Sequence, residues 1–195
     1  MNFLAHAYLS YENPELLIGN MVADFVKGQK WKNYPEGIRK GISLHRSIDQ
    51  FTDQHAVNRR LRAIFRPDNG LYCGVFLDVV YDHFLARDEK IFPGNRLFSF
   101  AYSTYDILQE HFRELPPKFQ ETLSYMRKQN WLYEYREKQG IWRSFRGIVN
   151  RAKYLSDATP AFREFENQYF MLEKGYHQFF PDLEAFVQDT IKNHS

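Results

Sequence analysis

The amino-acid sequence predicts an all-α protein, and three observations support this prediction. Apolar residues recur at helical spacing along the whole chain, and no segment alternates apolar and polar residues as a strand does. Pro and Gly cut this pattern into segments of ordinary helix length. A chain of 195 residues with 44% hydrophobic residues can bury one core, so we expect a single-domain helical bundle over residues 1–195.

Five helices are predicted before residue 87. Asn13 and Pro14 form an N-cap and first-turn pair, and Gly28 ends the helix that they begin. Pro35 opens the next helix, and Pro67 starts a Pro-Asp-Asn-Gly turn after the fourth. The predicted ranges are 2–10, 14–28, 35–51, 55–66 and 71–86.

Pro and Gly also divide the second half of the chain. A Phe-Pro-Gly-Asn break follows the fifth helix, Pro160 caps a long helix, and Pro181 begins the last one. The predicted ranges are 96–112, 118–129, 131–138, 141–155, 159–180 and 181 onward. No internal repeat, low-complexity tract or linker divides the chain into two domains.

The helix at 71–86, LYCGVFLDVVYDHFLA, is expected in the middle of the bundle. At about 100° per residue its apolar side chains point in nearly every direction. Asp78 and Asp82 nevertheless lie in it one turn apart, and His83 follows. A buried carboxylate is costly unless it is paired or binds a metal. Two interpretations stay open: each carboxylate forms a salt bridge with an Arg, or a cation lies between them.

The amino-acid composition indicates the cellular compartment in which the protein is expected. The single cysteine, Cys73, excludes a disulfide framework and fits a reducing compartment. The sequence has no basic segment followed by an apolar run at its start, and no stretch long enough to span a membrane. We therefore expect a soluble cytoplasmic protein with no membrane partner.

Positive charge gathers in one part of the chain. The net charge is only +2, yet residues 27–66 hold ten Lys or Arg against three acids. Arg59 and Arg62 fall on one helical face with Arg66, whereas Arg60 points away. This basic region favours an acidic partner or a phosphorylated substrate, and the alternative is a solvated basic helix.

Acids and imidazoles lie among apolar residues on four predicted helices. His45 and Asp49 are spaced i, i+4, which places their Cβ atoms about 5–6 Å apart, close enough for one ion to bridge. Asp24 and His6 stand in apolar surroundings on two further helices. Taken singly, each is explained by an exposed pair, a lone acid or a core histidine. Taken together, they match the way helical bundles build metal sites.

The N-terminal half carries four segments in a fixed order: NFLAH (2–6), GNMVADFVKG (19–28), GISLHRSIDQFTDQH (41–55) and DVVYDHFLAR (78–87). In order and spacing they resemble the acyl carrier protein phosphodiesterases, a family similar to an unusual branch of the HD-domain metal phosphohydrolases. Beyond them the resemblance rests on length and on scattered aromatics such as Trp131.

The resemblance implies an HD-domain-like helical fold and a manganese-dependent site. It also implies hydrolysis of the phosphodiester that joins 4′-phosphopantetheine to a serine of holo-acyl carrier protein, which would be the acidic protein substrate. Tyr8 stands where many relatives have a second His, so we assign this position no role. The positions carried over are His6, Asp24, His45, Asp49, Asp78, Asp82 and His83.

The residue types indicate which metals to expect. Carboxylates mixed with imidazole favour Mn²⁺, Fe²⁺ or Mg²⁺ over a closed thiolate zinc site, and among these the resemblance implies Mn²⁺. His6 and Asp49 act either as ligands or as residues that orient ligands. We assign as direct ligands Asp24, His45, Asp78 and Asp82.

Four further residues are given catalytic or binding roles. His83 is about 100° round the helix from Asp82, so we assign it as general acid rather than ligand. Arg46 would neutralise the phosphate, or else it is a surface residue beside the helix. Arg59 and Arg62 would contact the carrier protein.

Two other function classes remain open. One is an HD-type hydrolase that acts on a nucleotide or a guanosine polyphosphate, because a fold does not fix a substrate. The other is a metal-free helical binding module that uses the basic region. Nucleic-acid binding does not require acids in a buried helix, so we expect no nucleic-acid partner.

Overall fold

The computed structural model describes residues 1–193, and within them the chain forms eleven α-helices, four short 3-10 helices and no strand. The predicted all-α class is confirmed. The α-helices are α1 (Phe3–Tyr8), α2 (Pro14–Val22), α3 (Glu36–Gln54), α4 (Ala56–Asn69), α5 (Cys73–Ala86), α6 (Arg96–Glu110), α7 (Pro117–Gln129), α8 (Trp131–Glu134), α9 (Lys138–Arg151), α10 (Thr159–Asn167) and α11 (Tyr169–Asn193). The 3-10 helices are η1 (Ala23–Phe25), η2 (Gly28–Asn33), η3 (Gly70–Tyr72) and η4 (Phe112–Glu114). Residues 194 and 195 of the predicted domain lie outside the described residues.

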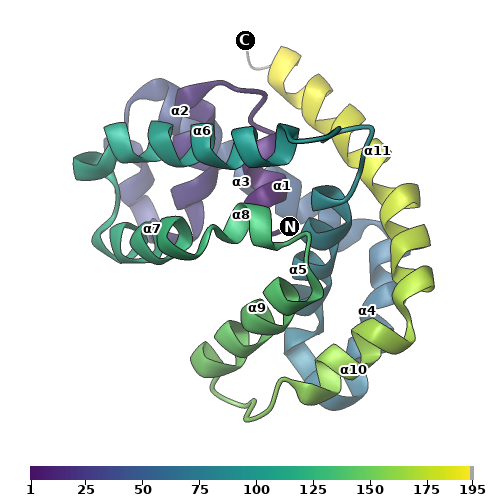
Figure 1. The fold of residues 1–195 in the computed structure, drawn as a ribbon. Coiled ribbons are helices and arrows are strands. Elements are labelled where there is room, and N and C mark those ends of the chain that lie inside the picture. The colour runs from purple at the N-terminus through teal and green to yellow at the C-terminus, as the bar shows by residue number, and fades with distance from the viewer. Residues whose placement is uncertain (194–195) are drawn as a thin grey trace.

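The helices surround α5 and the N-terminus. Figure 1 shows α6 crossing in front of α2 and α3, while α11 runs along the right-hand side of the molecule from α10 to the C-terminus. One continuous cluster of buried apolar side chains joins these helices. Aromatic pairs fill it, such as Phe76 of α5 against Phe145 of α9, with ring centroids 4.7 Å apart. The centre of the bundle is therefore closely packed and rich in aromatic rings.

Helices α2 and α3 touch through their backbones. A Cβ atom at Gly19 would lie 2.1 Å from the carbonyl oxygen of Ile38, and one at Gly41 would lie 2.5 Å from the carbonyl oxygen of Leu16. Only glycine permits this approach. It brings the C-terminal end of α2, with Asn20 and the following Asp24, against the middle of α3.

The central position of α5 holds from Phe76 onward but not at the start of the helix. Phe76, Val80 and Tyr81 are fully buried. The helix begins at Cys73 rather than at residue 71, after Gly70 takes a positive φ of 51°. Leu71 is 94% exposed and Val75 is 45% exposed, so the expectation that apolar residues are buried all round fails at this end.

Two predicted breaks at proline are wrong. The fourth helix continues through Pro67 to Asn69, and α11 continues through Pro181. The C-terminal break falls at Gln168, between α10 and α11. An interior proline costs a helix about 3 kcal/mol. Burial of large side chains on both sides of Pro181, such as Phe179 and Leu183, outweighs that cost at about 1.5–3 kcal/mol each.

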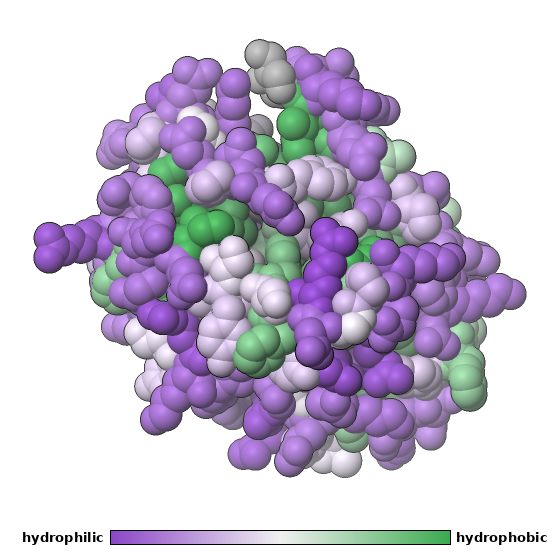
Figure 2. Space-filling model, turned by 45° about the horizontal axis from the view of Figure 1, so that its top comes forward, coloured by the Kyte–Doolittle hydropathy of each residue, from purple (hydrophilic) through white to green (hydrophobic). Residues whose placement is uncertain are grey.

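The surface is mostly hydrophilic. On the face drawn in Figure 2, hydrophobic residues show mainly in recesses between hydrophilic ones. Among residues 1–193, none of the helices combines the length and the apolar character that a bilayer crossing requires.

Candidate metal centre

Two histidine rings from different helices stack inside the bundle. His6 of α1 and His45 of α3 lie with ring centroids 3.9 Å apart and planes inclined by 13°. Both side chains are buried. The contact joins α1 to the α2–α3 pair, and it turns the Nε2 atoms of both rings toward Asp49.

Asn20 fixes the orientation of both rings. The side-chain Nδ2 of Asn20 donates to the carbonyl oxygen of His6 (2.8 Å), which turns its Oδ1 toward Nδ1 of His6 (2.7 Å). Nδ1 of His45 lies 2.8 Å from the backbone carbonyl oxygen of Asn20. Because both oxygens only accept, each Nδ1 carries a proton. The Nε2 atoms are thereby left for Asp49 or an ion.

Asp49 completes a compact group of ligand atoms. Its Oδ1 lies 3.3 Å from Nε2 of His6, and its Oδ2 lies 3.2 Å from Nε2 of His45. One ligand atom from each of the three residues falls within 4.8 Å of the others. Asp24, placed by η1, adds a carboxylate oxygen 3.2 Å from Nε2 of His45.

The donor set fits a divalent cation. Nε2 of His6 is buried and has no hydrogen-bond partner among the described residues, although it faces a carboxylate oxygen. A cation bound between these two electron-rich atoms would remove the repulsion between them. Imidazole nitrogen with carboxylate oxygen suits Mn²⁺, Fe²⁺ or Mg²⁺. The Asp24 side chain is 77% exposed, so the centre is reached from solvent on that side.

The pKa values follow from this crowding. Burial and the neighbouring His45 lower the pKa of His6 to about 4. Burial disfavours the charged ring of His45, but hydrogen bonds to Asp24 and Asp49 and their charges outweigh it and raise the pKa to about 9. Burial would raise the pKa of Asp49, yet its contacts with both histidines hold that pKa well below the usual range. The hydrogen bond to His45 lowers the pKa of Asp24.

Asp78 lies at the edge of this group. The Met1 ammonium nitrogen is 3.1 Å from Oδ1 of Asp49 and 3.5 Å from Oδ1 of Asp78, so it links the two carboxylates. Burial raises the pKa of Asp78. Burial would lower the pKa of the Met1 ammonium, but the charges of Asp78 and Asp49 raise it to about 10.

Asp82 and His83 have other partners. The carboxylate of Asp82 accepts hydrogen bonds from the backbone N–H groups of Leu4 (2.7 Å) and Ala5 (3.0 Å), and burial raises its pKa to about 7. Asp82 therefore holds the N-terminus of α1, which carries His6. Burial lowers the pKa of His83 to about 4.

The ring of His83 is held away from the stacked histidines. Its Nδ1 lies 2.7 Å from the carbonyl oxygen of Tyr135 and its Nε2 lies 2.9 Å from the hydroxyl of Tyr169. The structure thus groups His6, Asp24, His45, Asp49 and Asp78, and it gives Asp82 and His83 different neighbours. Their assignment as ligand and general acid stays a prediction.

The three predicted substrate-binding arginines differ in availability. Arg46 is exposed beside His45, and its guanidinium carbon lies 5.7 Å from the centre of the Trp31 ring. Arg59 is exposed on α4. Arg62 forms an ion pair with Asp53 and rests against Gly74 of α5.

The residue that sequence reasoning missed is Asn20. It stands one turn before Asp24 in an apolar helix, and that spacing was the available signal. An asparagine in such a place is ordinarily a local structural residue, and only the fold brings it against His6.

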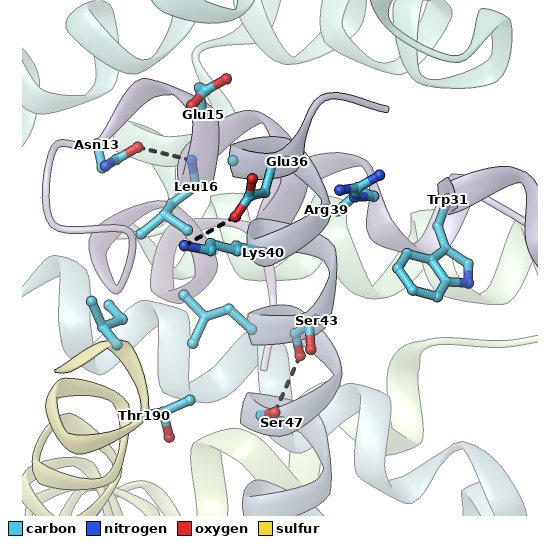
Figure 3. A pocket seen from close by; sticks show the side chains of 13 residues that line it. Asn13, Glu15, Leu16, Trp31, Glu36, Arg39, Lys40, Ser43, Ser47 and Thr190 are labelled. Carbon is cyan, nitrogen blue, oxygen red and sulfur yellow. Dashed lines mark hydrogen bonds and ion pairs between the residues drawn. The ribbon is translucent and has the colours of Figure 1, made fainter. Parts of the chain in front are cut away.

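A cavity of about 610 Å³ lies apart from the candidate metal centre. Figure 3 shows it beside Ser43 and Ser47. At about 100° per residue, these two positions lie on the side of α3 opposite to position 45.

Fold and site together define the class of protein: a helical bundle that gathers two histidines and several carboxylates at one partly open point. The model of the family "Acyl carrier protein phosphodiesterase" matches residues 1–183. The chain belongs to this family.

Individual relatives agree along nearly the whole chain. The acyl carrier protein phosphodiesterase of Serratia proteamaculans (strain 568) is 33% identical over 190 residues, which cover 97% of this chain and 98% of the relative. The protein of that name from Photorhabdus laumondii subsp. laumondii is 32% identical over 182 residues, which cover 93% of this chain and 92% of the relative. No solved structure matches the chain.

Proposed function

We propose that this protein hydrolyses the phosphodiester between 4′-phosphopantetheine and a serine of holo-acyl carrier protein. A water oxygen forms a bond to phosphorus, and the bond from phosphorus to the serine oxygen breaks. The serine oxygen takes a proton, and the products are apo-acyl carrier protein and 4′-phosphopantetheine. The observation that carries the proposal is the group formed by His6, His45 and Asp49, in a chain whose family is named acyl carrier protein phosphodiesterase.

The chain's own residues would bind and position the ion and the substrate. His6 and His45 would bind a divalent ion through Nε2, with Asp49 between them and Asp24 and Asp78 nearby. When bound, the ion would supply charge stabilisation at the phosphate and activate water. We propose Mn²⁺, with Fe²⁺ and Mg²⁺ as alternatives.

The positive surface would bring the substrate in. Arg46 stands beside His45, where it can meet phosphate oxygens that approach from the exposed side of Asp24. Arg59 is exposed on α4, and Arg62, which is paired with Asp53, lies beside the start of α5. An acidic carrier protein would be steered toward such a surface.

The test uses purified protein, holo-acyl carrier protein and Mn²⁺, with mass spectrometry of both products. We expect apo-carrier protein and 4′-phosphopantetheine, no reaction in excess chelator, and recovery when Mn²⁺ is restored. Asp49→Asn should abolish turnover. Asp182→Asn is the matched control, because it alters an exposed aspartate that pairs with His55 elsewhere. Turnover of guanosine polyphosphates in place of the carrier protein, or full activity in chelator, would contradict the proposal.

A further inference from the structure

The start of α5 presents an apolar surface to solvent. Leu71 of η3 and Val75 of α5 are 94% and 45% exposed. Leu71 is the most exposed large hydrophobic residue among those the structure describes. Leaving a leucine in water forgoes the free energy that its burial would supply, so this position is suited to contact with another molecule.

A second segment of the chain adds to the same surface. The backbone N–H of Lys153, just after α9, donates to the hydroxyl of Tyr72 at 3.1 Å. The next residue, Tyr154, is also exposed, and the Lys153 ammonium lies 5.2 Å from the centre of its ring. The "Leu71 surface" is defined as Leu71, Tyr72, Val75 and Tyr154.

The Leu71 surface lies along the chain from Asp78, which is at the edge of the candidate metal centre. Leu71 lies in η3, and Val75 and Asp78 follow it three positions apart on one face of α5. Asp78 is the third of them, and it is joined to Asp49 through the Met1 ammonium. A cavity of about 100 Å³ between α5 and α9 adjoins the surface, lined in part by Val75, Val79 and Arg151. A molecule that covered Leu71 would therefore lie beside the centre.

The rim of the Leu71 surface is basic. Arg151 ends α9 and Lys153 follows it, and neither forms an ion pair with an acid among the described residues. Both are exposed. An apolar patch with a cationic rim is complementary to a protein with an apolar patch and an acidic rim.

We propose that the Leu71 surface is the docking site of the acidic carrier protein. The inference rests on the proposed function and extends it, because it says which face of the enzyme receives the protein part of the substrate. The carrier covers Leu71 and Val75, its acidic residues meet Arg151 and Lys153, and its modified serine faces the metal centre, whose exposed carboxylate is Asp24.

The main test compares Leu71→Asp with Tyr125→Asp. Tyr125 is 59% exposed on α7, so the control adds the same charge at another exposed hydrophobic position. With holo-carrier protein, Leu71→Asp should lower kcat/KM about tenfold or more through KM. Hydrolysis of bis(p-nitrophenyl) phosphate, which has no carrier to dock, should match that of wild type. Tyr125→Asp should resemble wild type on both substrates.

A second pair of variants tests the basic rim. Arg151→Glu should weaken carrier binding at low salt, and the loss should shrink as salt screens the charges. Arg113→Glu on η4 makes the same change in net charge away from this surface and should have no such effect. Binding is measured in chelator, so that no turnover takes place.

The outcomes separate docking from catalysis. If wild type binds the carrier, Leu71→Asp weakens that binding and no variant cleaves it, the docking site stands and the proposed function fails. Equal carrier affinity for Leu71→Asp and Tyr125→Asp overturns the docking site. Equal loss on both substrates overturns it too, as does a wild-type dimer that Leu71→Asp dissociates without a change in carrier affinity.

Discussion

Replacing Asn20 by alanine should weaken the metal centre without touching a ligand. The change removes the acceptor of the His6 Nδ1 proton and the donor to the carbonyl oxygen of His6 and the hydroxyl of Ser10. The His6 ring is then free to rotate or to change tautomer. The backbone carbonyl that holds His45 remains, so only one of the two rings is released.

The magnitude follows from these contacts. Three buried hydrogen bonds at about 1 kcal/mol each predict a loss of about 3 kcal/mol in the free energy of unfolding. Loss of a group that orients a metal-binding histidine typically lowers metal affinity 10- to 100-fold, in order of magnitude. Mn²⁺ at a fixed saturating concentration should then stabilise the variant by about 1.4–2.7 kcal/mol less than wild type.

Urea unfolding with and without Mn²⁺ measures stability, and calorimetric titration measures affinity. Asn58→Ala is the matched control, since Asn58 is also buried and hydrogen-bonds to the carbonyl oxygen of Thr52 and the hydroxyl of Tyr81. Asn58→Ala should lower the free energy of unfolding by about 2 kcal/mol and leave the Mn²⁺ affinity unchanged. Asn20→Asp, which retains an acceptor for His6, should recover part of the affinity. If Asn20→Ala binds Mn²⁺ as tightly as Asn58→Ala does, the orienting role of Asn20 is wrong.

Three further predictions concern the same helices. In metal-free protein the pKa of His45 is about 9 against 6.5 when unfolded, so its protonation stabilises the fold. That contribution, at most about 3 kcal/mol, is complete below pH 6.5 and lost as the pH rises through 9. Urea titrations measure the free energy of unfolding at each pH, and saturating Mn²⁺ should make it nearly independent of pH. If the metal-free protein already shows no pH dependence, the stabilising role of His45 protonation is wrong. Asp49→Asn should lower Mn²⁺ affinity at least about tenfold, by calorimetry, because it weakens the carboxylate that faces both histidines; unchanged affinity would exclude Asp49 as a ligand. Asp82→Ala should cost about 2–4 kcal/mol in thermal unfolding, because the buried N–H groups of Leu4 and Ala5 lose their acceptor; a cost under about 1 kcal/mol would mean that water replaces it.

Local signals in the sequence predicted the elements well where they act within one helix. Asn13 caps α2 as expected, accepting from the N–H of Leu16 at 3.0 Å. Pro181 misled the prediction, because the burial that keeps α11 continuous depends on partners distant in sequence. Leu71 misled it too, since an apolar residue at the end of a buried helix gives no indication that the fold leaves it uncovered.

The candidate metal centre could be predicted from the sequence only where its residues lie on the same helix. The i, i+4 spacing of His45 and Asp49 is a property of α3 alone, and the two residues do meet. The role of Asn20 depends on contact with His6, fourteen positions away. The partners of Asp82 are 77 and 78 positions away, so no pattern within α5 indicates them. Predictions from spacing therefore ended where tertiary packing decides the partners.

The contact between Gly19 and Gly41 affects how the candidate metal centre should respond to destabilising substitutions in other helices. Where side chains separate two helices, a core substitution can let the helices drift apart. Here the backbones of α2 and α3 are in direct contact, with no side chains between them. A substitution in the core therefore cannot change the distance between Asn20 and His45 by removing side-chain volume from this interface. We expect amides of α2 and α3 to be among the slowest to exchange with deuterated solvent. Variants that loosen the outer helices should keep their ion-binding geometry until the whole domain unfolds.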